Sequence, residues 1–140
     1  GGTISGGTCF RISKLGVELK NLYYFFESHN DLLAISEQIS AGPRFKGWKK
    51  FPKALLPDSL NEYIYVVSIK RFHDAVYFSR VELHHCVSLM RQLGFLPDLA
   101  NYLDLHKESF HHHLFDIGID YISDHDGILI PKKMAIYGII

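Results

Sequence analysis

Apolar residues recur at helical spacing between Ser79 and Leu114, so this stretch predicts three short helices in succession. The first begins with the capping-box pair Ser79 and Glu82 and ends at Gly94. The second begins at Pro97, a residue favoured in a first helical turn. The inner positions are Leu83, Cys86, Leu89, Met90 and Leu93 in the first helix, Leu99, Ala100 and Leu103 in the second, and Ser109, Phe110, His113 and Leu114 in the third.

Short helices joined by tight turns predict a helix-turn-helix. Two of its helices must cross closely, which requires a small side chain at the crossing, and Ala100 has the position for it. A turn at residues 104–106 would separate the second helix from the third. The outer face of the third helix would then be presented to a partner.

The other periodic stretches predict three further helices and two strands. Helices are expected at residues 16–28, 32–39 and 128–140, the last with Pro131 in its first turn, and strands at residues 9–13 and 62–72. His73 and Asp74 would form a linker. We therefore expect an α+β chain that is mostly α. A small helix-and-strand part of unknown type at residues 1–74, sensory or dimerising, would precede a four-helix helix-turn-helix domain at residues 75–140.

Charge is balanced overall but not along the chain. The 15 basic and 15 acidic residues cancel, yet residues 1–74 carry a net charge of +3 and residues 75–140 carry −3. Seven of the nine histidines lie in the acidic half, so its charge should rise as the pH falls through the range in which histidines titrate. A net negative charge on the expected helix-turn-helix domain counts against simple DNA binding, because DNA is itself negatively charged.

The two cysteines and the hydropathy pattern bear on the compartment. Cys9 and Cys86 have neither the number nor the spacing of a disulfide framework or a zinc finger, which favours a reducing compartment. No apolar run reaches the length needed to span a membrane. We expect a cytoplasmic protein without a membrane partner.

From about residue 78 onward, the order of these parts resembles the LuxR-type (GerE-like) DNA-binding domain of bacterial transcription regulators. The matching positions are Ser79 and Glu82 for the family's cap, Leu83, Cys86 and Leu89 for its first helix, Leu99, Ala100 and Leu103 for its scanning helix, residues 103–114 for its turn and recognition helix, and Ala135 and Gly138 for its tail. The segment after the recognition helix is acidic here, whereas the family usually has a basic one.

The resemblance implies a bacterial transcription regulator that binds DNA as a homodimer, is not an enzyme and needs no cofactor. The residues expected on DNA are Lys107, Ser109, His111 and His112 at the bases and Arg91, Lys132 and Lys133 at the phosphates. A second basic patch, Arg44, Lys46, Lys49 and Lys50, lies in the aromatic-rich segment at residues 42–53. Such segments can track a phosphate backbone, although the same composition fits a solvated loop whose aromatic side chains pack on the domain.

Two other functions fit parts of the sequence. The −3 charge of the second half favours a DNA-inert helix-turn-helix protein that regulates by binding another regulator. Cys9 followed by His73 has the order of a papain-like cysteine hydrolase, with Asp74 or Asp116 to orient the imidazole.

No metal site is predicted, although the chain has two runs of potential ligands. These runs are residues 84–86 (His-His-Cys) and residues 111–113 (three histidines). Adjacent residues on a helix point about 100° apart, and the pair of histidines four residues apart that binds zinc on a helix is missing.

Overall fold

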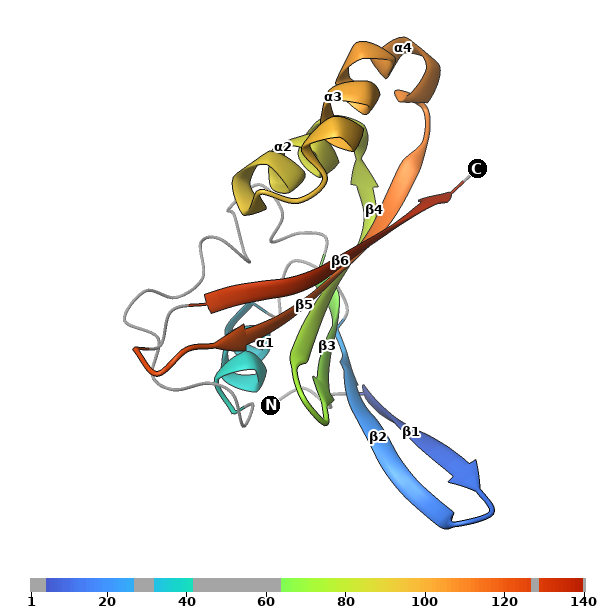
Figure 1. The fold of residues 1–140 in the computed structure, drawn as a ribbon, viewed down its shortest axis with the longest axis vertical. Coiled ribbons are helices and arrows are strands. Elements are labelled where there is room, and N and C mark those ends of the chain that lie inside the picture. The colour runs from blue at the N-terminus through green and yellow to red at the C-terminus, as the bar shows by residue number, and fades with distance from the viewer. Residues whose placement is uncertain (1–4, 27–31, 42–63, 127–128, 140) are drawn as a thin grey trace.

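The computed structural model describes residues 5–26, 32–41, 64–126 and 129–139, which form the strands and helices of Figure 1. In chain order these elements are β1 (Ser5–Ser13), β2 (Gly16–Phe25), α1 (Leu32–Ser40), β3 (Ile64–Lys70), β4 (Asp74–Glu82), α2 (Leu83–Leu93), α3 (Pro97–Leu105), α4 (Lys107–Phe110), β5 (Leu114–Ser123) and β6 (Leu129–Ile139). The expected helix over residues 32–39 and the expected strands over residues 9–13 and 62–72 are confirmed as α1, β1 and β3.

The six described strands form one antiparallel sheet in which sequence neighbours are also spatial neighbours, in the order β1-β2-β3-β4-β5-β6. Helix α1 is inserted between β2 and β3, and helices α2, α3 and α4 are inserted between β4 and β5. Strands β1 and β6 are the edges. The β1–β2 hairpin extends away from the rest of the molecule, on the side opposite α2, α3 and α4 (Figure 1).

One face of the sheet is the core face. Side chains alternate between faces along a strand, and opposite residues in neighbouring strands share a face. The register pairs Val67 with Val76 and Val76 with Ile119, and all three are buried. The helices cover this face with Ile35 and Ile39 of α1, Leu83, Cys86, Val87, Leu89 and Met90 of α2, and Ala100 and Leu103 of α3, which all belong to the same buried cluster.

The fold class expected from the sequence, a mostly α chain with a four-helix helix-turn-helix domain, is wrong. The described residues are mostly β. Residues 16–25 form strand β2 instead of a helix, and residues 129–139 form strand β6 instead of a closing helix. The third expected helix is a single turn, α4, followed by strand β5.

The first two helices of the expected motif exist, but the first begins later than expected. Strand β4 continues to Glu82, and α2 begins at Leu83. Ser79 is therefore not a helix cap. Its hydroxyl donates to Asp116 Oδ1 at 3.0 Å, and the same oxygen accepts the backbone N–H of Arg80 at 3.0 Å. Arg80 has a φ of 58°, and these contacts hold an irregularity in the β4–β5 register.

The expected boundary at residues 74 and 75 lies within the sheet. Strand β4 begins at Asp74 and pairs with β3 on one side and β5 on the other. The residues predicted to form a linker, His73 and Asp74, belong to this hairpin: the backbone N–H of Lys70 donates to the carbonyl of His73 at 3.2 Å.

Candidate functional site

The residues expected at DNA bases are exposed at one end of the molecule. Lys107 and Ser109 lie on α4, and His111 and His112 follow it in a turn; all four are exposed. Ala100 is fully buried in α3, as a residue at a helix crossing should be. The segment from residue 107 is therefore presented outward, but as one helical turn that leads into a strand.

The residues expected at phosphates are not gathered around α4. Arg91 forms an ion pair with Asp104 at 2.7 Å, so its charge is compensated within the α2–α3 pair. Lys133 lies opposite Asp120, six residues along β5 from Leu114, the first residue of that strand after α4. Six residues of strand span about 20 Å, which separates Lys132 and Lys133 from the α4 end of β5. The basic patch Arg44, Lys46, Lys49 and Lys50 lies outside the described residues.

Aromatic and imidazole rings cover the surface of α3 and α4. The rings of Tyr102 and His106 are tilted against each other, with centroids 4.4 Å apart, and the rings of His112 and His113 are 4.2 Å apart. The ring nitrogen Nδ1 of His111 lies 2.8 Å from the carbonyl oxygen of Glu108. These rings form a polar, histidine-rich surface in which Lys107 is accompanied by the acidic Glu108.

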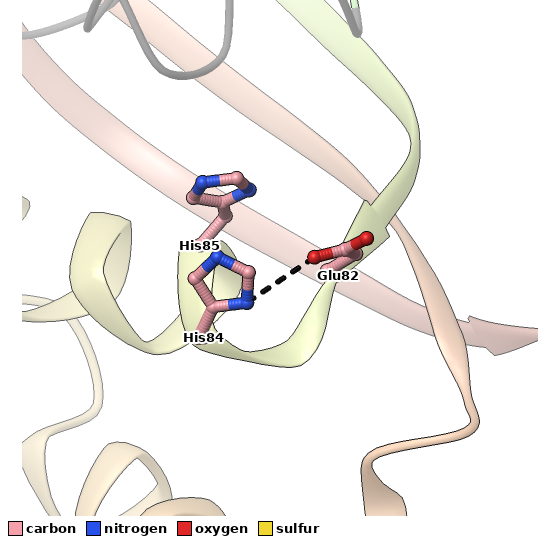
Figure 2. Close-up of side chains that lie close together, drawn as sticks. All are labelled: Glu82, His84 and His85. Atoms are coloured by element: carbon pink, nitrogen blue, oxygen red, sulfur yellow. Dashed lines mark ion pairs between the residues drawn. The ribbon is translucent and has the colours of Figure 1, made fainter.

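A second group of histidines lies where β4 meets α2. Glu82 is the last residue of β4, and His84 and His85 belong to the first turn of α2. His84 Nδ1 lies 3.3 Å from Glu82 Oε2, and the ring centroids of His84 and His85 are 3.9 Å apart. Figure 2 shows the two rings beside each other, with the Glu82 carboxylate turned toward His84.

A polar network lies on the opposite face of the sheet from the core. Asp120 of β5 accepts a hydrogen bond from Lys70 Nζ at 2.6 Å, and its second oxygen lies 2.8 Å from His73 Nε2. Lys70 Nζ also lies 5.5 Å from the centre of the Tyr77 ring. Burial alone would lower the pKa of Lys70, but its hydrogen bonds with Asp120 and Tyr77 outweigh burial and raise that pKa above its ordinary value. The network therefore ties β3, β4 and β5 together while Lys70 is charged.

The structure does not bring together the cysteine and histidine of the hydrolase hypothesis. Cys9 lies on the edge strand β1, whereas the imidazole of His73 contacts Asp120 of β5. Three strands separate β1 from β5, a distance of about 19 Å across the sheet. The carboxylate beside His73 is thus neither of the two expected ones, and Asp116 instead holds Ser79 and Arg80. The other cysteine is buried, and burial raises the pKa of the Cys86 thiol to about 11.

An exposed apolar surface lies on the outer part of the β1–β2 hairpin, residues 10–19, which we call the arm. Besides Leu15 in the turn, which is fully exposed, four of its apolar side chains are exposed: Phe10 by 52%, Ile12 by 79%, Val17 by 68% and Leu19 by 46%. Phe10 pairs with Leu19 and Ile12 pairs with Val17, so all four share one face.

This apolar face continues the core face of the sheet. Phe10 and Thr8 lie two residues apart on β1, and Thr8 pairs with Leu22. Leu22 pairs with Ile69, which shares a face with the buried Val67. The opposite face of the arm has charges that are paired: Glu18 contacts Lys20 at 2.9 Å and Arg71 at 2.5 Å. The arm is therefore amphipathic, and none of the described helices covers its apolar side.

Sequence reasoning missed both the arm and the Glu82–His84–His85 group. The apolar–polar alternation of residues 10–12 and 17–19 was a usable signal for the arm, but the expected helix over residues 16–28 concealed it. The histidine group was not predicted because neighbouring helical residues diverge. Its carboxylate comes from the strand before the helix, so helical spacing could not reveal it.

Comparison with protein-family models, with curated proteins and with solved structures found no match for this chain. Within the described ranges, no helix has the length and apolar character required to cross a membrane.

Proposed function

We propose that this protein is a self-associating interaction module whose arm packs against the arm of a second copy. The observation that carries the proposal is the uncovered apolar face formed by Phe10, Ile12, Val17 and Leu19. A two-stranded ribbon is only marginally stable by itself in water. Covering its apolar face would stabilise the ribbon and remove that surface from solvent.

A second copy fits this face better than an unrelated partner of unspecified shape. Two arms related by a two-fold axis present the same apolar pairs to each other, as an isologous interface requires. Packed face to face, they would form a small two-layer sandwich with sheets about 10 Å apart. The charged residues Glu18, Lys20 and Arg71 would point outward in both copies, and their ion pairs would remain intact.

The expected affinity is modest. Full burial of a Val, Leu, Ile or Phe side chain contributes about 1.5–3 kcal/mol, and these four are about half to four-fifths exposed. Eight such side chains in a two-fold pair would contribute roughly 10 kcal/mol, against an association cost of about 4 kcal/mol or more. We expect a dissociation constant on the order of 10–100 µM.

The test is the oligomeric state across a concentration series, measured by sedimentation equilibrium. The wild-type chain should shift from monomer to dimer, and Ile12→Thr combined with Val17→Thr should shift it back to monomer. Threonine keeps the β-branched shape that favours a strand, so the arm should persist. Arg11→Gln with Glu18→Gln alters the charged face and is the matched control, which should still dimerise. A wild-type chain that stays monomeric throughout, or a threonine pair that dimerises like wild type, would refute the proposal.

A second candidate function is transcription regulation, by contact with DNA or with another regulator, in a bacterial cytoplasm. The supporting observation is the shared exposure of Lys107, Ser109, His111 and His112. It requires no helix-turn-helix domain, because the one-turn α4 and the following turn could contact phosphates as a loop does. The two unpaired thiols, Cys9 and Cys86, fit a reducing compartment.

The test of this second function is titration with a promoter fragment at low salt and pH 6. Lys107→Ala and His112→Ala should each weaken binding by about 1–3 kcal/mol if they contact bases. Absence of binding at pH 6 would exclude the DNA branch. A pull-down of another regulator by the DNA-inert chain would support the other branch.

A further inference from the structure

We propose that Glu82, His84 and His85 bind a divalent transition-metal ion of the zinc type, at the junction of β4 and α2. Among the residues that the structure describes, these three offer a carboxylate oxygen and two imidazole nitrogens that all lie within 4.8 Å of one another. The group is built without the arm and does not depend on self-association.

The spacing of the donor atoms fits a metal site. Zinc binds imidazole nitrogen and carboxylate oxygen at about 2.0–2.2 Å in a tetrahedron, so two ligand atoms on one ion lie about 3.3–3.5 Å apart. Glu82 Oε2 and His84 Nδ1 are 3.3 Å apart, which matches this distance. The remaining ligand atom belongs to the half-buried His85. Because Glu82 and His84 are both exposed, small rotations of their side chains would bring their ligand atoms to the same distance from it.

The local fold explains how neighbouring histidines come to share one ion. His84 and His85 follow directly on the strand end, and their side chains converge: the ring centroids are 3.9 Å apart with an interplanar angle of 42°. The 100° divergence expected for adjacent helical residues is therefore offset by their side-chain conformations. Glu82 lies outside the helix and approaches the rings from the strand (Figure 2).

The donor set and its surroundings define the class of ion. Two imidazoles with one carboxylate suit Zn²⁺, Ni²⁺ or Cu²⁺, whereas Mg²⁺ and Ca²⁺ prefer sites made of oxygen ligands. The N-terminus of α2 has a partial positive charge that opposes a cation, and the Glu82 carboxylate compensates it. Three protein ligands leave a position for water or for a ligand from a partner. Side-chain exposures of 67% for His84 and 56% for Glu82 indicate a site of moderate affinity that is open to solvent.

The histidines at residues 111–113 are the internal control. They supply three imidazoles, against two in the proposed site, but they lie in the turn after α4. His111 Nδ1 is within hydrogen-bonding distance of the Glu108 carbonyl. A chain that captures metal merely through clustered histidines would use this run. The structure instead assigns the site to the group that includes a carboxylate.

The experiment is titration of the untagged, metal-free chain with ZnCl₂ by isothermal calorimetry, and with CoCl₂ by visible absorption. We expect one site per chain, and a Co²⁺ spectrum of the four-coordinate type. Glu82→Gln and His84→Ala should each reduce Zn²⁺ affinity at least about tenfold, since mutation of the groups around a metal costs about 10–100-fold. His111→Ala with His112→Ala should leave the affinity unchanged, and so should the arm variant Ile12→Thr with Val17→Thr. Circular dichroism would confirm that each variant is folded.

Three results would overturn the proposal. The folded wild-type chain could fail to bind Zn²⁺ at about millimolar concentrations, which exceed the dissociation constant expected for a functional site of this kind. Glu82→Gln and His84→Ala could bind with wild-type affinity. The histidine pair at residues 111 and 112 could prove to be the one whose loss abolishes binding. Because the arm variant tests self-association separately, failure of the metal site would leave the proposed function standing, and the reverse also holds.

Discussion

At the scale of single residues, the tightest approach to any described glycine lies between Gly118 of β5 and Tyr77 of β4. A Cβ at residue 118 would lie 2.8 Å from Tyr77 Cε1, and the ring is also beneath Lys70 Nζ. Gly118→Ala should therefore lower the free energy of unfolding by about 1–3 kcal/mol, the usual cost of overpacking. Urea denaturation would measure it.

Gly138→Ala is the matched control for that substitution. It also adds a methyl group to the sheet, but the atom closest to that methyl, on the Phe115 ring, would be at 3.9 Å, an ordinary contact distance. We expect a change of less than about 0.5 kcal/mol. If both alanine variants unfold at the same urea concentration, the Tyr77 ring moves aside freely and the constraint at Gly118 is absent.

The Lys70–Asp120 pair should make stability depend on alkaline pH. The pKa of Lys70 is raised from its ordinary 10.5, so the fold favours the charged lysine. This contribution is complete below pH 10.5 and is lost as the pH rises through the raised folded-state pKa. Asp120→Asn removes the negative partner and should cost about 1–2 kcal/mol near neutral pH.

The check is a set of urea denaturation curves at several pH values from neutral to strongly alkaline. The difference between wild type and Asp120→Asn should shrink at the alkaline end, because both then have a neutral Lys70. A difference that stays constant across the series would mean that Asp120 acts through packing, or through His73, and not through the charge of Lys70.

The two cysteines should differ in reactivity. The pKa of Cys86, raised by burial to about 11, leaves little thiolate near pH 8, and the side chain is fully buried. With a thiol-reactive dye at pH 8, Cys86 should react only as the chain unfolds, whereas the partly exposed Cys9 should react first. Cys9→Ser should remove the fast phase. A fast phase that persists in that variant would place Cys86 within reach of solvent.

At the scale of elements, the crossing of α2 and α3 depends on a small side chain. Ala100 is fully buried between helices that share one core cluster. Ala100→Leu should destabilise the protein by about 1–3 kcal/mol, because the added atoms force the helices apart. Leu105→Ala, in the same helix but 81% exposed, is the control and should change stability by less than about 0.5 kcal/mol. Equal thermal midpoints for the two variants would contradict close packing at Ala100.

Elements whose residues obey one period were predictable from sequence, and elements with an irregular register were not. The strand at residues 62–72 and the helix at residues 32–39 follow a single pattern, and both were found. In β2 one extra residue lies between the partners of Cys9 and Phe10. Leu19 and Asn21 are two residues apart but pair with consecutive residues of β1, so they do not share a face. The broken alternation left apolar positions that imitate a helix.

Strand β6 shows a second physical cause of error. Proline is favoured in a first helical turn, as expected for Pro131, but it is also tolerated on an edge strand, where no neighbouring strand requires the N–H that it lacks. Here it lies opposite Tyr121, next to another register shift, on the edge of the sheet. Local preference could not decide between the two, because whether a strand is an edge depends on the whole sheet.

At the scale of the whole molecule, the resemblance to a helix-turn-helix domain was local. The small residue Ala100 and the turn at residue 106 are present, and Leu103 is buried, but Leu99, the other expected inner residue of the second helix, is 38% exposed. The next segment, Leu114–Ser123, has buried residues at the alternate positions 115, 117, 119 and 121, a spacing typical of a strand. Matching this segment to the recognition helix of a known motif concealed that spacing. The Glu82–His84–His85 group, unlike the arm, had no signal in the sequence, because its three side chains come together only in the tertiary structure.

The continuity of the sheet leads to a prediction about the two halves of the chain. Strand β4 uses β3 as one neighbour, and the core cluster joins Ile35, Ile39 and Val67 of the first half to Val76 and Phe78 of the second. A fragment of residues 75–140 would expose one edge of β4 and the apolar surface that α1 covers. An uncovered edge and core face are unfavourable in water and promote aggregation.

We therefore expect fragment 75–140 to lack a cooperative unfolding transition when circular dichroism is followed during urea denaturation. Mixing it with fragment 1–74 should restore a transition, since the two would complete the same sheet. The intact chain is the control and should unfold in one step. If fragment 75–140 alone unfolds cooperatively, α2, α3, β4, β5 and β6 form an independent unit, and residues 1–74 are an addition to it.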